Sequence, residues 1–222
     1  MVKMQALRRP RALLFDFGGV FTESPFTAVE DFGHAIGADP RVVSEIVFGS
    51  YEHDGEHPWH RLERGEISLE TTRDLILELG RERGLEVDLL KLFARMAARD
   101  PSAGSGARGE LIARVRTLRH QGYRTGMITN NVREFGDMWR TLIPVAELFE
   151  FVVDSSRVGV RKPDRRIFEL ALARLGDVAA SECVFLDDHP ANVRAADALG
   201  MHGLLVGPDP ARTVADLDTL LG

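Results

Sequence analysis

The stretch LLFDFGGVFT, residues 13–22, places one carboxylate, Asp16, between an apolar run and two glycines. The apolar residues 12–15 are contiguous rather than alternating, which is typical of a strand buried on both faces of a parallel sheet. Asp16 then lies at the carboxyl end of the predicted strand, where open α/β sheets bind their ligands. Gly18 and Gly19 permit a close approach of the backbone that a Cβ would prevent. The stretch predicts either a ligand-binding strand end or an ordinary strand closed by a Gly-Gly turn.

Composition and charge set the first limits on function. The chain has 222 residues, 44% of them apolar, which is enough for one large domain or for a core domain that carries an insertion. The net charge of −6 is spread without a block of like charge, so neither nucleic acid nor an anionic membrane is expected as a partner. Any anionic substrate must therefore be bound by a local cation.

Cysteine content and the amino-terminal segment indicate the compartment. Cys183 is the only cysteine, so an intramolecular disulfide is impossible, and its apolar neighbours indicate a small core residue. The apolar run that begins at Ala12 is interrupted by Asp16, which makes it too short for a signal peptide or a membrane span. We therefore expect a soluble, untargeted protein in a reducing, cytoplasmic setting, as a monomer or a homodimer.

Residues 23–107 show no pattern of a buried strand. Apolar residues recur there at helical spacing, and Ser68 is the predicted N-cap of the longest helix. The pattern predicts an all-helical cap domain over 23–107, inserted between two parts of a core domain, 1–22 and 108–222. The segment PSAGSGARG, residues 101–109, is the predicted linker back to the core. Helices are expected at residues 26–36, 42–47, 58–62, 69–79 and 89–96.

After the linker, helical patterns and apolar strand patterns alternate. Pro163 marks the predicted start of the helix at 167–175. Together with the strand at 12–15, the alternation predicts an α/β fold, a doubly wound, parallel, Rossmann-like sheet of about five strands with an inserted helical cap. The other strands are predicted at residues 123–128, 151–153, 184–186 and 203–206, and the other helices at 111–118, 135–142, 191–199 and 214–221.

Polar and charged side chains lie at the predicted strand ends and helix starts. Thr129, Asn130 and Asn131 offer a hydroxyl and two amides that could hold an oxyanion at a helix N-terminus or form an ordinary N-cap. Lys162 directly precedes a predicted helix, where the helix macrodipole disfavours a cation. This position indicates a partner such as a phosphate or a carboxylate, although a solvated surface lysine would show the same pattern.

Asp187 and Asp188 are adjacent carboxylates at the end of the strand predicted at 184–186. If they converge with Asp16, the carboxylates raise one another's pKa unless a cation lies among them. Oxygen ligands with few carboxylates and room for water suit Mg²⁺. The alternative is that one of the two aspartates merely caps the helix that begins at Pro190.

Taken together and in this order, the stretches that contain Asp16, Thr129, Lys162 and Asp187 resemble the haloacid dehalogenase superfamily of aspartate-nucleophile hydrolases. The resemblance extends over nearly the whole chain. SSRVGVRKPDRRIF at 155–168 and CVFLDDHPANVRAADALGM at 183–201 are similar to one branch of that superfamily. The branch holds the N-terminal phosphatase domain of soluble epoxide hydrolases and small bacterial sugar-phosphate phosphatases. RLERGEIS at 61–68 is similar to a cap segment of the same branch.

The resemblance implies Mg²⁺-dependent hydrolysis of a small-molecule phosphate monoester, such as a sugar phosphate, through an aspartyl-phosphate intermediate. Asp16 would be the nucleophile, with Lys162 and Thr129 as the other catalytic residues. Lys162 would neutralise charge on Asp16 and on the phosphoryl group. The implied phosphoryl-binding residues are Thr129, Asn130, Lys162 and Gly19, and the implied Mg²⁺ ligands are Asp16, the Gly18 carbonyl and Asp188, with Asp187 behind it.

One position departs from the family pattern. Phosphatases of the family usually carry Asp-x-Asp, whose second aspartate is the general acid and then the general base, and this chain has Gly18 there. General acid or base catalysis contributes roughly 10²- to 10⁴-fold, so its loss predicts a slower enzyme or a leaving group that needs little protonation. Anomeric sugar phosphates, acyl phosphates and aryl phosphates meet that condition.

Histidines could supply a substitute proton donor, because imidazole titrates near neutral pH. The candidates are His53, His57 and His60 in the predicted cap and His189 in the core. The three cap histidines also allow a metal site, although metal-site signatures have stricter ligand spacing.

Two other functions stay open. Gly18 allows a catalytically weak or silent protein that only binds a phosphate ligand. Asp16 also allows a metal-free 2-haloacid dehalogenase in which the carboxylate attacks carbon, but such an enzyme has no use for the paired Asp187 and Asp188.

Overall fold

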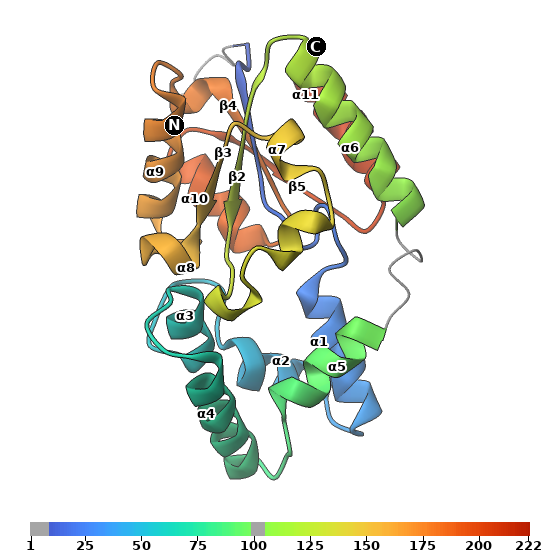
Figure 1. Cartoon of the computed structure of the whole chain (residues 1–222), viewed down its shortest axis with the longest axis vertical. Helices are drawn as coiled ribbons and strands as arrows, with labels where there is room; N and C mark the ends of the chain where they lie inside the picture. Colours follow the sequence, from blue (N-terminus) through green and yellow to red (C-terminus); the bar gives the residue numbers. More distant parts are fainter. Residues whose placement is uncertain (1–8, 99–104) are drawn as a thin grey trace, which may run out of the picture.

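The computed structural model describes residues 9–98 and 105–222. Its centre is a five-stranded sheet in the order β3-β2-β1-β4-β5, with every neighbouring pair parallel (Figure 1). The chain winds outward from β1 to β3 and then continues on the other side of β1, so the sheet is doubly wound as predicted. The strands are β1 (Ala12–Phe15), β2 (Arg124–Thr129), β3 (Phe151–Asp154), β4 (Cys183–Asp187) and β5 (His202–Leu205).

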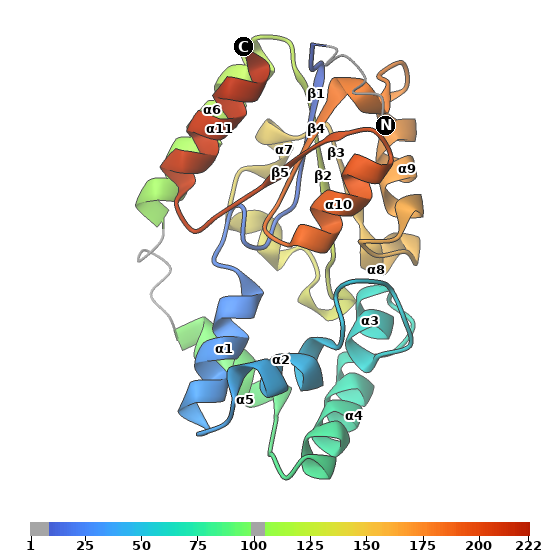
Figure 2. The same cartoon turned by 180° about the vertical axis from the view of Figure 1, so that it is seen from behind.

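β1 lies in the middle of the sheet and is buried on both faces. None of its four side chains is exposed, as its contiguous apolar run predicts. Because side chains alternate along a strand, Leu13 and Phe15 pack with α6 and α11, whereas Ala12 and Leu14 pack with α9 and α10. Figures 1 and 2 show these helices on opposite sides of the sheet. One layer contains α6 (Ser105–His120), α7 (Val145–Leu148) and α11 (Pro210–Leu221), and the other contains α9 (Arg165–Leu175) and α10 (Pro190–Ala198).

Helices α1–α5 form a helical insertion between β1 and α6, beyond the carboxyl ends of the strands (Figures 1 and 2). Its described residues contain no strand, as predicted. An apolar cluster around Val29 and Phe32 fills the insertion, and Val132 of the core joins it. Ser68 caps α4 as predicted, because its hydroxyl accepts the Thr71 amide at 3.1 Å. The helices are α1 (Pro25–Ala35), α2 (Pro40–Phe48), α3 (Pro58–Glu63), α4 (Leu69–Glu82) and α5 (Leu89–Ala98).

Three local predictions differ from the structure. The helix predicted at 135–142 is wrong: two 3-10 turns, η1 (Arg133–Phe135) and η2 (Met138–Thr141), flank Gly136, whose φ of +56° interrupts a helix. The helix predicted to start at Pro163 begins at Arg165 instead, because Asp164 accepts the Arg166 amide and caps it. The predicted linker at 101–109 lies partly outside the described residues, and its second half belongs to α6. The remaining short elements are α8 (Ser155–Val158) and η3 (Ala180–Glu182).

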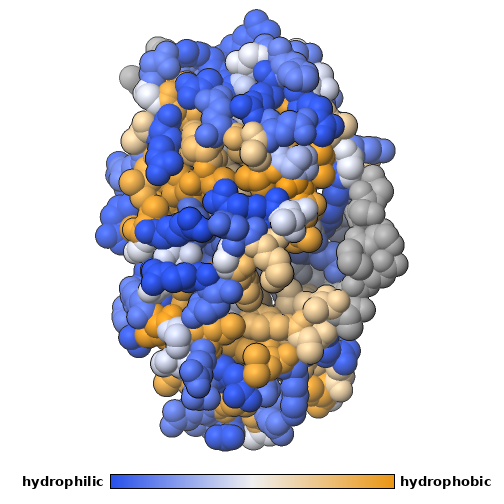
Figure 3. All heavy atoms as spheres, in the orientation of Figure 1, coloured by the Kyte–Doolittle hydropathy of each residue, from blue (hydrophilic) through white to orange (hydrophobic). Residues whose placement is uncertain are grey.

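The surface carries apolar residues among hydrophilic ones, without one uniform face in the view of Figure 3. Met138 and Leu142 on and beside η2 are the most exposed large apolar side chains among the described residues, at 73% and 61%. Of the helices that the structure describes, none combines the length and the apolar character needed to cross a membrane.

Candidate active site

The carboxyl ends of β1, β2 and β4 bring the predicted site residues to one edge of the sheet. Asp16 directly follows β1, and its backbone N–H donates to the Leu186 carbonyl of β4 at 2.8 Å, so the residue is held against β4. Thr129 ends β2, and Asp187 ends β4. This edge, where the winding reverses beside β1, is where doubly wound sheets bind ligands.

Lys162 is the cation at this edge. Its Nζ lies 2.6 Å from Asp16 Oδ1 and 2.7 Å from Asp187 Oδ2, and the side chain is buried. Burial alone would lower the pKa of Lys162, but the two carboxylates outweigh it and raise the pKa, so the ammonium group stays charged. The prediction that Lys162 pairs with a carboxylate is therefore correct, and the surface-lysine alternative is wrong.

Asp16, Asp187 and Asp188 form the acidic cluster, in which one oxygen of each carboxylate lies within 4.8 Å of the others. Burial is the main cause that raises the pKa of Asp16 to about 8, and Asp187 and Asp188 add to it while Lys162 opposes it. Burial and Asp187 likewise raise the pKa of Asp188 to about 6. Three carboxylates face one ammonium group, so a further cation is needed to neutralise the ionised cluster.

Asp187 is held from several sides. Its Oδ1 accepts the His189 amide at 2.8 Å and the Asn192 side-chain amide at 3.0 Å, while Oδ2 accepts from Lys162. The idea that an aspartate caps α10 is wrong: His189 is the N-cap, and its Nδ1 accepts the Ala191 amide at 3.3 Å. These hydrogen-bond donors orient the Asp187 carboxylate and compensate for its burial.

Asn130 binds the backbone of Lys162 in both directions. Its Oδ1 accepts the Lys162 amide at 2.8 Å, and its Nδ2 donates to the Lys162 carbonyl at 3.1 Å. The helix N-terminus predicted after Thr129 is absent, because the described chain continues into the 3-10 turn η1 and Asn131 bonds instead to Asp154. The Asn130 side chain therefore positions the residue that carries the cation.

Two histidines of the insertion, His57 and His60, are ill suited to proton transfer near neutral pH. Burial lowers the pKa of His57 to about 4 and, with help from Arg161, the pKa of His60 to about 3. His57 caps α3 by accepting the Trp59 amide. Within residues 9–98 and 105–222, the acidic cluster is the only group with metal-ligand geometry, so the structure does not support a metal site at the three cap histidines.

Sequence reasoning missed Arg161, which is completely buried. Its Nε lies 2.6 Å from Oε2 of Glu63 at the end of α3, and its guanidinium stacks on the Tyr51 ring at 4.6 Å. Glu63 also accepts the Tyr51 hydroxyl at 2.7 Å and the Trp59 indole N–H at 2.8 Å. The ion pair therefore joins the helical insertion to the residue that precedes Lys162. In the sequence, the only sign of this role was that a second cation, Arg161, stands next to Lys162.

Gly19 is required next to the acidic cluster. Its φ is +72°, and a Cβ there would lie 2.0 Å from Asp188 Oδ2 and 2.1 Å from its Cγ. Gly84 has the same φ of +72° but nothing within 4 Å of the corresponding Cβ position. Substitutions at Gly19 and Gly84 therefore separate the cost of backbone strain from the cost of steric conflict.

We expect Gly84→Ala to lower the free energy of unfolding by about 1–2 kcal/mol, the cost of the left-handed backbone. Gly19→Ala should cost a further ~1–3 kcal/mol, because Asp188 must move away from the new methyl group. Urea denaturation of both variants gives the two values. Equal losses would contradict the close packing of Gly19 against Asp188.

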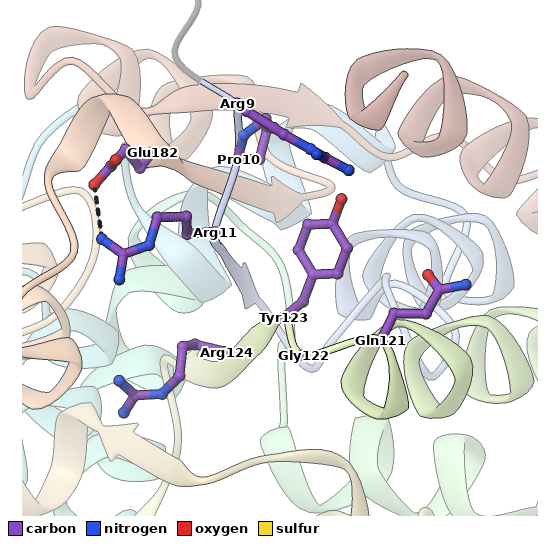
Figure 4. Close-up of a pocket in the computed structure, with 8 residues that line it drawn as sticks. All are labelled: Arg9, Pro10, Arg11, Gln121, Gly122, Tyr123, Arg124 and Glu182. Carbon is purple, nitrogen blue, oxygen red and sulfur yellow. Dashed lines mark hydrogen bonds and ion pairs between the residues drawn. The ribbon is translucent and has the colours of Figure 1, made fainter.

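A separate cavity of about 670 Å³ lies at the opposite edge of the sheet, where β1 and β2 begin (Figure 4). Arg11 and Arg124 line it, together with Tyr123. The two arginines are already paired: Arg11 with Asp177 and Glu182, and Arg124 with Glu150. This cavity contains none of the predicted site residues and is not the candidate active site.

Comparison with known proteins identifies the family to which the chain belongs. The family model of haloacid dehalogenase-like hydrolases matches residues 10–200, so the chain belongs to this family. It is 31% identical to acyl-CoA dehydrogenase family member 10 of Mus musculus, over 97% of this chain and 19% of that protein. It is 29% identical to sesquiterpene phosphatase astK of Aspergillus oryzae, over 96% of this chain and 97% of that protein.

Two further similarities agree with the resemblance found in the sequence. Bifunctional epoxide hydrolase 2 of Mus musculus is 26% identical over 96% of this chain and 39% of that protein. The chain thus spans about a fifth of the first relative and about two fifths of this one. A predicted HAD-like family hydrolase from Porphyromonas gingivalis has a solved structure that is 26% identical, with a TM-score of 0.65 over 96% of this chain and 98% of that chain.

Proposed function

We propose that this protein hydrolyses a small phosphate monoester in a Mg²⁺-dependent reaction, through an aspartyl-phosphate on Asp16. The observation that carries the proposal is the buried Lys162, whose Nζ bridges Asp16 and Asp187 inside a cluster of three carboxylates. A relative that matches this chain along nearly its whole length is named a phosphatase, which supports the same reaction class.

The acidic cluster fits a hard divalent cation. Carboxylate oxygens within 4.8 Å of one another need only small movements to share an ion of the size of Mg²⁺. Asp16 and Asp188, with the Gly18 carbonyl, would hold the ion, and Asp187 would stand behind them because its oxygens already accept hydrogen bonds. When bound, Mg²⁺ neutralises phosphoryl charge and acts as a Lewis acid.

The side chains of this site supply the other steps. A carboxylate oxygen of Asp16 attacks phosphorus, and the bond from phosphorus to the ester oxygen breaks, with its electron pair leaving on that oxygen. Lys162 would offset negative charge on the phosphoryl group, and Thr129 and Gly19 would bind its oxygens. Asn130 would contribute through its side chain by holding the Lys162 backbone in place. Water then cleaves the aspartyl-phosphate, which releases inorganic phosphate and restores Asp16.

We further propose that the helical insertion acts as the cap of this site, over residues 23–107. It lies beyond the carboxyl ends of the strands (Figure 1), the edge at which Lys162 pairs with Asp16. Helix α3 reaches the core through the Arg161–Glu63 ion pair. Such a cover excludes water from the reacting groups and contributes to substrate selection.

A phosphatase screen tests the proposed function. Purified protein with Mg²⁺ is expected to turn over 4-nitrophenyl phosphate faster than alkyl phosphates, because Gly18 provides no general acid and an aryl oxygen needs little protonation. Excess chelator should abolish the activity, since the cluster then lacks the cation that neutralises it. The assay measures phosphate release with Mg²⁺, with chelator and after Mg²⁺ is restored.

Two outcomes would contradict the proposal. No turnover of the aryl phosphate or of a panel of sugar phosphates would favour a protein that only binds a phosphate ligand. Release of halide from a 2-haloacid in excess chelator, without phosphatase activity, would favour the metal-free dehalogenase instead.

A further inference from the structure

A cavity of about 590 Å³ adjoins the acidic cluster. Asp188 and Gly19 form the wall that it shares with the cluster, and Ser24, Arg108 and Val206 are among the residues of its other walls. The volume is in the range of small-molecule sites. Because Asp188 belongs both to the cluster and to this cavity, a phosphate held at the cluster has space beside it for the rest of its molecule.

Arg108 is the cation of this cavity. It comes from the start of α6, where the chain returns from the helical insertion to the sheet. Its Nη1 is buried and has no hydrogen-bond partner among the described residues. Burial lowers the pKa of the guanidinium, and the charges of Glu23 and Asp188 oppose that shift, so the group remains a cation.

A buried guanidinium N–H without an acceptor is costly, and it gains most from an anionic acceptor. Carboxylate and phosphate match the planar fork of arginine better than a hydroxyl does. The neighbouring walls offer the Ser24 and Thr27 hydroxyls and the apolar Val206 and Pro208. The cavity thus combines a short apolar surface with the carboxylates of Glu23 and Asp188 and with the Arg108 guanidinium, whose Nη1 has no acceptor among the described residues.

We propose that this cavity binds the leaving group of the phosphate ester and that Arg108 binds a second anionic group on it, a carboxylate or a second phosphate. This inference rests on the proposed phosphatase function. It narrows the substrate class to phosphate monoesters whose alcohol part is itself negatively charged. Arg108 is then a specificity-determining residue, separate from Asp16 and Lys162.

Three matched aryl substrates test the proposal: phenyl phosphate, 4-carboxyphenyl phosphate and 1,4-phenylene bisphosphate. The wild-type protein should show a higher kcat/KM for one or both charged substrates than for phenyl phosphate, and the preferred one identifies the anion. Arg108→Gln should lower this preference roughly 10- to 100-fold, mainly through KM, because a hydrogen bond to a charged group is lost. Arg108→Lys should retain part of the preference.

Arg114→Gln is the matched control, because Arg114 lies on the same helix and pairs with Asp218 at the surface. It should leave the preference unchanged. A preference that survives Arg108→Gln, or a wild-type protein without any preference, would overturn the subsite while the phosphatase function stands.

Binding measurements keep the subsite testable if none of the three substrates is turned over. Calorimetry compares phenylphosphonate with 4-carboxyphenylphosphonate and 4-phosphonophenyl phosphate in the presence of Mg²⁺. Tighter binding of a doubly charged ligand that depends on Arg108 would support the subsite even in a protein without turnover. Equal affinity of all three for the wild-type protein would overturn it.

Discussion

Replacing Asp16 with asparagine is expected to lower Mg²⁺-dependent turnover of 4-nitrophenyl phosphate by on the order of 10⁶-fold, the loss seen when an enzyme loses its nucleophile. The amide keeps the shape of the carboxylate, but its oxygen is a poor nucleophile. It also leaves the buried Lys162 without the charge that lies 2.6 Å from its Nζ. Steady-state phosphate release at saturating Mg²⁺ measures the effect.

Asp88→Asn is the matched control for this experiment. Asp88 is also a buried carboxylate paired with a cation, since Arg73 Nε lies 2.8 Å from its Oδ1, but it belongs to the helical insertion away from the acidic cluster. The Asp88 variant should keep its turnover per folded molecule. Near wild-type turnover of Asp16→Asn would show that Asp16 is not the nucleophile.

Covalent trapping separates nucleophilic attack from a merely electrostatic role of Asp16. After rapid acid quenching, mass spectrometry should find a phosphoryl group on the peptide that contains Asp16 in the wild-type protein. A wild-type protein that turns over substrate and never carries this group would contradict the aspartyl-phosphate, even if Asp16→Asn were inactive.

The second large effect is expected on stability. Glu63→Gln should lower the free energy of unfolding by about 3–5 kcal/mol, because it removes the carboxylate nearest to the buried Arg161 guanidinium and leaves it the longer contact with Asp54 Oδ1, at 3.5 Å. The pair is well enclosed: Arg161 is 0% exposed and Glu63 is 4% exposed, with 2.6 Å between Nε and Oε2. Urea denaturation at neutral pH measures the loss.

Arg83 and Glu45 form the matched control pair. They lie 2.9 Å apart, join two parts of the helical insertion, and are 49% and 65% exposed. Glu45→Gln should cost less than about 1 kcal/mol, because water screens an exposed pair. A similar loss for Glu63→Gln and Glu45→Gln would mean that burial does not set the strength of the Arg161–Glu63 pair.

The double variant Arg161→Met/Glu63→Gln tests whether Arg161 and Glu63 stabilise the protein as a pair. Removing both charges also removes the cost of leaving one of them unpaired, so the double variant should lose less stability than the two single losses added together. Additive losses would show that the two residues act independently, in conflict with their contact.

Much of the fold followed from local patterns. The four contiguous apolar residues before Asp16 predicted a strand buried on both faces, and the structure places that strand at the centre of the sheet. The segment at 135–142 was mispredicted because its apolar spacing suits a helix, whereas Gly136 adopts a positive φ that splits it into two 3-10 turns. Apolar spacing reports burial, and a single backbone dihedral overrides it.

The sequence was sufficient to predict those site residues that the parallel strands bring together. Asp16, Thr129 and Asp187 stand at the ends of three predicted strands, and parallel pairing alone brings such ends to one edge. Lys162 was found as a cation in an unfavourable place before a predicted helix. Its partners, at 2.6 and 2.7 Å, explain that placement better than the helix does.

The sequence by itself therefore determined the fold class, the family and the residues of the acidic cluster, because these depend on periodicity and on short motifs at strand ends. Only the tertiary structure decided which side chains support them. Arg161 meets Glu63 across 98 positions of the chain, and Asn130 meets Lys162 across 32. Such pairs depend on how distant segments pack, and no local pattern records whether a charged side chain is buried against a partner or left in water.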